Sequence, residues 1–204
     1  MLNIQARHLF YYIIFLFFTI DISAHDIGAE SSKDLWRKLW EDQISWMRSA
    51  MVAKIDDSVG EKVYKERLMK NSSDMNQELL GSYGEECAKL SSLISEHLEI
   101  ADEVFKYVEA RDIRALYYNY SIWHNNAQDI AQAMNRLNPN FWPTNDAEGM
   151  WKELLEALLA EATAHEKGNF QEEVAAHDLV HNKALEIADF FSSGITQQFP
   201  RSLE

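Results

Sequence analysis

The sequence predicts an all-α protein, a compact bundle of three antiparallel helical hairpins that carry an internal repeat. Apolar residues in the stretch from Tyr118 to Pro139 recur at intervals of four, three, four and three, which is the spacing of one helix face and excludes a strand. A shortened copy of this stretch follows at 180–191, and a weaker copy precedes it at 68–79. The chain has only 7 glycines and 3 prolines in 204 residues, as expected for long uninterrupted helices.

The apolar pattern and its breaks place the helices in order along the chain. Six helices are expected, at about 32–55, 60–83, 85–110, 112–138, 147–167 and 170–193. Gly84 and Gly194 are the expected caps that end the second and the last helix. Pro139 ends the fourth helix, because proline disfavours helical geometry in the residue before it, and 138–149 is the one expected loop.

Short connections make paired helices antiparallel, which predicts hairpins at about 32–84, 85–138 and 147–194 within a single domain, 32–204. Three similar hairpins could stack as an open solenoid or close into a bundle. The compact form is favoured, because neither outer hairpin has an obvious polar face to serve as an end cap.

The N-terminal residues have the order of a secretory signal peptide. Arg7 and His8 precede the apolar run 9–20, and Asp21 with the small residues before His25 follows it. This predicts a signal peptide at 1–24, a flexible lead-in at 25–31, and a secreted or periplasmic protein. The alternative is a membrane anchor formed by 9–20, although a spanning helix needs about twenty apolar residues.

The net charge limits the classes of partner, and the cysteine content limits the disulfides that the chain can form. The net charge of −14 repels phosphate backbones and anionic lipid surfaces, so no nucleic-acid partner is expected, and membrane contact is expected only if the N-terminal segment is retained. Cys87 is the sole cysteine and cannot form an intrachain disulfide. Trp36, Trp40 and Trp46 cannot all face the core, so exposed aromatic residues are expected to offer a surface to a protein partner or to a second copy.

Two polar residues fall at the centre of apolar helix faces. His97 lies between Leu90, Leu93 and Ile100, and Gln43 holds the equivalent place in the first helix. A buried polar group without a partner costs about 1–3 kcal/mol, so each residue must find one. The simpler interpretation is a hydrogen bond between repeats; the sharper one is a small polar pocket that holds a metal.

The best candidates for metal ligands are His177, Asp178 and His181, with His97 as a possible fourth. The two nearby histidines are four residues apart and share a helix face, and Asp178 and His181 have the three-residue spacing of paired ligands. The Glu-x-x-His motif of ferritin-type di-iron bundles does not occur in the chain.

Several runs in the chain resemble a family of uncharacterised small bacterial all-helical proteins, some of which carry the label acetylglutamate kinase without supporting motifs. The runs are LWEDQISWMR (39–48), LISEHLEIA (93–101), WHNNAQDIA (123–131) followed by LNP, HDLVHNKALEIAD (177–189) and GITQQFP (194–200). The family's first helix has a histidine where this chain has Gln43 and a threonine where it has Met47. In the fifth helix of this chain, Leu154 stands at the equivalent histidine position. Of these positions, only the one at His97 holds a histidine. The resemblance implies a helical bundle and no established chemistry.

The sequence contains no nucleophile elbow, phosphate-binding loop or complete metal motif. It therefore favours an exported, non-enzymatic binding or structural module, with no cofactor that can be named. Two alternatives stay open: a metal-binding bundle that uses the histidine and aspartate ligands above, and a carrier of a small apolar ligand in a cavity lined by aromatic residues.

Overall fold

The computed structural model describes residues 24–200, and the side chains from residue 31 onward. The predicted signal peptide, and the anchor that is its alternative, lie outside this part of the chain. The helices are α1 (Ala24–Ile55), α2 (Glu61–Tyr83), the short 3-10 helix η1 (Gly84–Cys87), α3 (Ala88–Glu109), α4 (Ile113–Leu137), α5 (Thr144–Glu166) and α6 (Phe170–Gln198). No strand occurs in the described residues, which confirms the all-α prediction.

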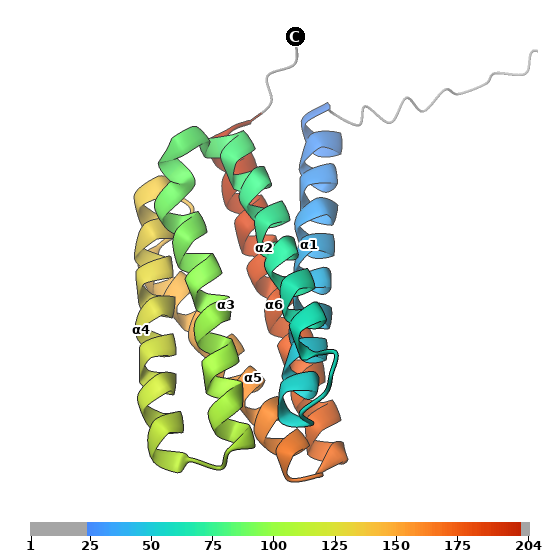
Figure 1. Ribbon diagram of the computed structural model, residues 1–204. Coiled ribbons are helices and arrows are strands. Elements are labelled where there is room, and N and C mark those ends of the chain that lie inside the picture. The colour runs from blue at the N-terminus through green and yellow to red at the C-terminus, as the bar shows by residue number, and fades with distance from the viewer. Residues whose placement is uncertain (1–23, 201–204) are drawn as a thin grey trace, which may run out of the picture.

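The helices pack as a compact bundle, as predicted, and not as an open stack (Figure 1). Helix α1 packs against α2 on one side and against α6 on the other, while α3 packs on α4 and α5 on α6. The contact between α1 and α6 brings the first and last helices together and closes the bundle. The α1–α2, α3–α4 and α5–α6 connections lie at the same end of the bundle (Figure 1).

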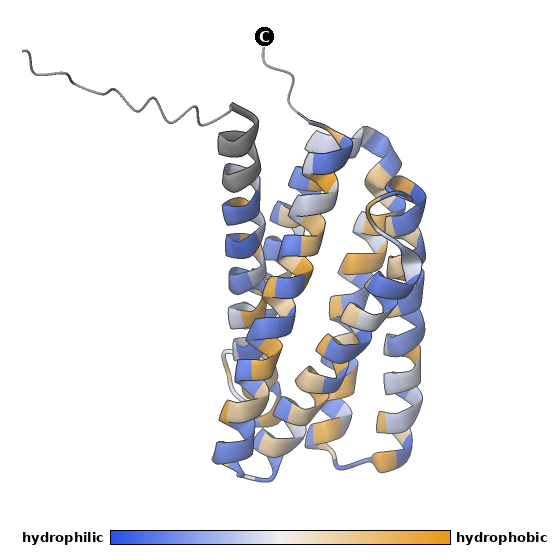
Figure 2. Cartoon of the chain, turned by 180° about the vertical axis from the view of Figure 1, so that it is seen from behind, coloured by the Kyte–Doolittle hydropathy of each residue, from blue (hydrophilic) through white to orange (hydrophobic). Residues whose placement is uncertain are grey.

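The apolar stripes that predicted the helices form the core. In Figure 2 hydrophilic and hydrophobic residues alternate along each helix, as expected for helices with one buried face. Most stripe residues of α2, α4 and α6 are buried: Leu68, Met75, Leu79, Trp123, Ala127, Ile130, Met134, Val180, Ala184, Ile187 and Phe191. Leu137 is half-buried, and Val63 and Tyr64 near the start of α2 are exposed. Burial of each larger side chain contributes about 1.5–3 kcal/mol, so these stripes supply much of the stability. None of the described helices combines the length and the apolar character needed to cross a membrane.

Three predicted boundaries are wrong. Residues 25–31, expected to be a flexible lead-in, belong to α1, whose backbone is helical from Ala24. The loop expected at 138–149 ends at Pro143, because α5 already begins at Thr144. The backbone of Pro143 is extended, which suits the residue before a helix, and Trp142 is fully buried and fixes the loop to the bundle.

Gly194 is the predicted cap of the last helix, but it lies inside α6, which continues to Gln198. Its backbone packs against Trp142, whose indole N–H donates to the carbonyl of Phe190 at 2.9 Å. A Cβ at position 194 would meet the Trp142 Nε1 atom at 2.0 Å. A close approach of a ring, and not a turn, therefore requires this glycine. Gly84, by contrast, caps α2 as predicted, with a positive φ of 58°.

Of the three tryptophans of α1, only Trp46 is partly exposed to solvent. Trp36 and Trp40 are buried, because α1 has neighbouring helices on several sides. Trp46 is half-buried beneath the guanidinium of Arg67, which lies 4.8 Å from the centre of its ring. The exposed aromatic side chains that lie near the start of α4 and α6 are Tyr117, Tyr118 and Phe170.

The two helical glycines 194 and 149 give a matched test of this packing. We expect Gly194→Ala to lower the free energy of unfolding by about 1–3 kcal/mol, because Trp142 must shift and lose its bond to Phe190. We expect Gly149→Ala to raise it by about 0.4–1 kcal/mol, because a Cβ there has no atom within 4 Å and alanine favours a helix. Urea unfolding followed by circular dichroism measures both; equal effects at the two positions would contradict the packing role of Gly194.

Candidate functional site

Gln43 is buried and forms a hydrogen bond with Asn71 of the neighbouring helix α2. The Asn71 amide donates to the Gln43 Oε1 atom at 2.8 Å and to the backbone carbonyl of Leu39 at 3.0 Å. Leu39 and Gln43 are one helical turn apart on α1, so one asparagine contacts both the backbone and the side chain of that turn.

His97 has the same arrangement with Asn126, one helix pair later in the chain. The two side chains are 2.7 Å apart, from His97 Nδ1 to Asn126 Oδ1, and the Asn126 amide donates to the carbonyl of Leu93 at 3.2 Å. Each polar pair therefore joins two adjacent helices, α1 and α2 for Gln43–Asn71 and α3 and α4 for His97–Asn126. The predicted hydrogen bonds between repeats are not formed, because each asparagine faces the helix that precedes it in the chain.

The contact with Asn126 determines which nitrogen of His97 carries the proton. Because the Asn126 amide nitrogen donates to Leu93, its oxygen faces the ring, so His97 Nδ1 must donate and Nε2 holds a lone pair. Nε2 is buried and has no hydrogen-bond partner among the described residues. Burial lowers the pKa of His97 to about 4, which the bond to Asn126 only partly opposes, so the ring is neutral at pH 7.

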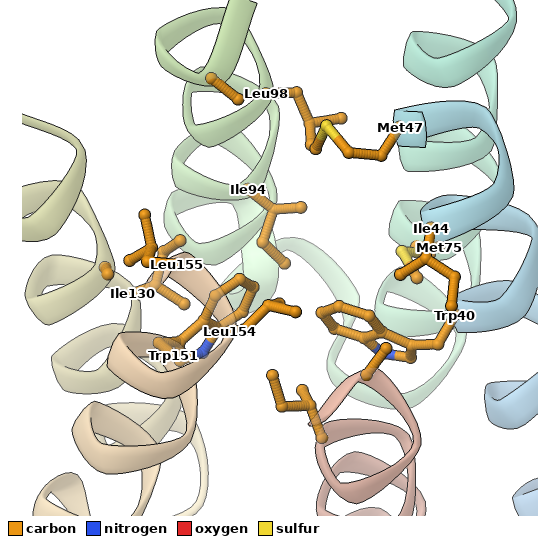
Figure 3. Close-up of a cluster of buried hydrophobic side chains, with 14 of the residues drawn as sticks. Trp40, Ile44, Met47, Met75, Ile94, Leu98, Ile130, Trp151, Leu154 and Leu155 are labelled. Carbon is orange, nitrogen blue, oxygen red and sulfur yellow. The ribbon is translucent and has the colours of Figure 1, made fainter. Parts of the chain in front are cut away.

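A small cavity adjoins His97 at the centre of the bundle. Its volume is about 30 Å³, and Trp40 of α1 and Trp151 of α5 reach toward each other across it (Figure 3). Ligand pockets usually measure about 300–1,000 Å³, whereas this volume suits roughly one water molecule. This cavity is therefore too small for an apolar ligand of ordinary size, and the carrier of an apolar ligand stays a prediction.

The structure does not bring the four predicted metal ligands together. His97 lies in the core, Asp178 is exposed, and His181 lies 3.9 Å from a surface glutamate. His177 instead contacts Glu161 of α5. Within residues 24–200, no three histidine, cysteine, aspartate or glutamate side chains converge in a way that could hold a metal ion. The spacing of His177, Asp178 and His181 on α6 predicted neighbouring ligands, but these side chains have different surroundings.

A buried charged cluster that the sequence analysis missed lies where α1, α5 and α6 meet. Glu161 of α5 and Glu173 of α6 have side chains only 1% and 4% exposed. Arg48 of α1 bridges them, since one terminal nitrogen of its guanidinium donates to Glu161 and the other to Glu173. One cation from the first helix thus holds two carboxylates from the last two helices.

Two histidines complete this cluster in a crosswise pattern. His177 Nδ1 lies 3.0 Å from Glu161 Oε1, and His165 Nδ1 lies 3.0 Å from Glu173 Oε2. Each helix supplies a Glu-x-x-x-His motif, 161–165 on α5 and 173–177 on α6, and each glutamate contacts the histidine of the other helix. That doubled motif is the sequence signal of the cluster, and it is one residue longer than the Glu-x-x-His motif of di-iron bundles.

The two buried carboxylates differ in their tendency to ionise. Burial raises the pKa of Glu161 despite the opposing effects of His177 and Arg48, and its Oε2 atom has no partner in the described structure. Burial also opposes ionisation of Glu173, but the bonds from His165 and Arg48 outweigh it and lower the pKa of that carboxyl. Removing one partner of a buried ion pair typically costs about 3–5 kcal/mol, so Arg48 is needed to keep both acids in place.

An open pocket of about 580 Å³ lies over the Arg48 side of this cluster, at the end of the bundle where the helix connections gather. Its wall combines charged groups with apolar and aromatic ones. The lining residues are Arg48, Ser49, Val52, Ala53, Asp56, Ser58, Tyr64, His165, Phe170, Glu173 and Val174. His165 Nε2 also lies 3.2 Å from Asp56 Oδ1, which connects the buried charges to the rim. The volume is within the usual range for a small-molecule site.

Comparisons with family models, curated proteins and solved structures give no match for this chain. The resemblance to uncharacterised bacterial helical proteins therefore stays a prediction. The run 39–48, on which that resemblance partly rests, ends in Arg48, so the central residue of the charged cluster lies within it.

A double-mutant cycle tests the polar pair of α3 and α4. We expect His97→Leu and Asn126→Leu each to lower the free energy of unfolding by about 1–3 kcal/mol, because each leaves a buried polar partner unpaired. The double variant should lose less than the sum of the two by about 0.5–3 kcal/mol. Urea unfolding of the four proteins measures this difference. Strictly additive losses would show that the two side chains do not interact.

The lowered pKa of His97 predicts how stability changes with pH. The unfolded imidazole takes up a proton near pH 6.5, whereas the folded one does so only near pH 4. The unfolded state therefore binds more protons in this range, and stability should fall as pH drops from 7 to 4, by about 3 kcal/mol from this residue. Unfolding of the wild type and of His97→Leu at several pH values isolates this share, because the carboxylates contribute to both proteins. Parallel curves would contradict it.

Proposed function

We propose that this chain is an exported, non-enzymatic binding module whose pocket above Arg48 takes a small ligand. The observation that carries the proposal is the position of the buried charges directly beneath an open pocket of about 580 Å³. Buried ion pairs add little to stability compared with apolar packing, so their presence in a core whose other described polar side chains are uncharged favours a functional role. The Arg48 side chain remains 31% exposed and forms part of the pocket wall.

Glu161 does not line the pocket, and the arrangement of the charged groups that do line it favours binding over catalysis. Glu173 accepts from both Arg48 and His165, and the two ring nitrogens of His165 each face a carboxylate. Groups held in this way define the shape and charge of a wall, whereas a general base needs an atom free to reach the proton of a substrate.

We also infer that the bundle consists of three hairpins derived from one repeated unit. The polar pairs support this, because Asn71 and Asn126 each donate to a backbone carbonyl of the preceding helix and contact the polar side chain four residues further along it, Gln43 or His97. In the third pair of helices the corresponding positions hold Leu154 and Lys183, so neither member of the polar pair is kept there. Export rests on the signal-peptide pattern of residues 1–24 alone.

Two valine substitutions test the pocket. We expect Val174→Trp to fill the pocket and to weaken the binding of fragments there by at least about tenfold, which corresponds to about 1.4 kcal/mol. Val63→Trp is the matched control, because both valines are exposed at 57% and 64% but only Val174 lines the pocket. The measurement is a screen of neutral and charged aromatic fragments by amide chemical shifts. Fragments should shift residues 48–58 and 165–174, and shifts elsewhere only would contradict the proposal.

A further inference from the structure

We infer that the ligand of this pocket is a small organic cation, an ammonium group carried on an apolar or aromatic body. This inference rests on the proposed binding function of the pocket. The charged atoms of the wall that remain available to a ligand, and the surfaces around them, favour this class of ligand.

The basic side chains of the wall already have carboxylate partners. Both terminal nitrogens of Arg48 donate to buried carboxylates, and His165 places one ring nitrogen against Glu173 and the other against Asp56. An anionic ligand would compete with these carboxylates for the donors of Arg48, and displacing Glu161 or Glu173 would leave a buried charge without its partner. The wall therefore offers little to a carboxylate or a phosphate.

Asp56 is the charged group of the wall that can accept a new contact. It follows the end of α1, its side chain is 59% exposed, and only its Oδ1 atom faces His165. The second carboxylate oxygen is in a position to accept from an ammonium group, and a charge-assisted bond of this kind is among the stronger polar contacts. The net charge of −14 adds a long-range field that attracts cations.

The rest of the pocket suits the body of such a ligand. Tyr64 of α2 and Phe170 of α6 are both exposed and line the pocket, together with the apolar side chains of Val52 and Val174. An aromatic face attracts a cation as well as an apolar group. An ammonium ion with a hydrophobic body would therefore meet a carboxylate and aromatic rings in the same pocket.

Three probes of similar shape and different charge test the inference: 2-phenylethylammonium, 3-phenylpropan-1-ol and 3-phenylpropanoate. Amide chemical shifts of the folded protein are followed during titration with each probe. The ammonium should produce saturable shifts in residues 48–58 and 165–174, with an affinity at least about tenfold higher than that of the alcohol. Asp56→Asn should remove most of this preference. Asp74→Asn should keep it, because Asp74 pairs with Lys70 on α2 and does not line the pocket.

The outcomes separate the ligand class from the binding function itself. If the alcohol or the propanoate binds the same residues as tightly as the ammonium, the inference of a cation is overturned while the pocket stands. A preference for the ammonium that survives Asp56→Asn also overturns it. If no probe shifts residues 48–58 or 165–174, both the cation and the proposed pocket function are wrong.

Discussion

The packing of the first helix against the last is the contact on which the rest of the bundle depends. Arg37 of α1 donates to both carboxylate oxygens of Asp189 of α6 at 2.6 and 2.7 Å, and Trp36 stacks on Phe191 with ring centres 5.0 Å apart. The ion-paired residues are 152 positions apart in the chain. Without this contact the facing apolar stripes of α1 and α6 would lie in water, and the helices would form an open stack instead of a closed bundle.

The same contact also assembles the charged cluster. Helix α1 reaches from the closing ion pair to Arg48, which enters the space between α5 and α6 and contacts an acid from each of them. Two buried carboxylates facing each other without a cation would be strongly unfavourable, so the cluster exists only when all three helices are in place. The pocket wall is therefore a product of the closed fold, and its charged groups are positioned by helices and not by mobile loops.

The fold was predictable from the sequence because its signals are local. Apolar spacing along α4 and α6 defined the buried faces, and the position of His97 at the centre of such a face indicated its burial. The cluster was not predictable in this way: Glu161 is one of 33 acidic residues, and its burial depends on an arginine 113 positions away. Gly194 shows the same limit, since a glycine near the end of a helical pattern suggests a cap, whereas the ring of Trp142 from another part of the chain decides its role.

The contact between α1 and α6 also restricts how a chain of this design can change in length. In an open array of helix pairs, a further pair can be added at either end, because the terminal pair only needs a new neighbour. Here both end helices already cover each other, so an inserted or duplicated pair would separate Trp36 from Phe191 and Arg48 from its two acids. Relatives with the same closure should therefore vary in their connections and surface residues while the number of helix pairs stays fixed.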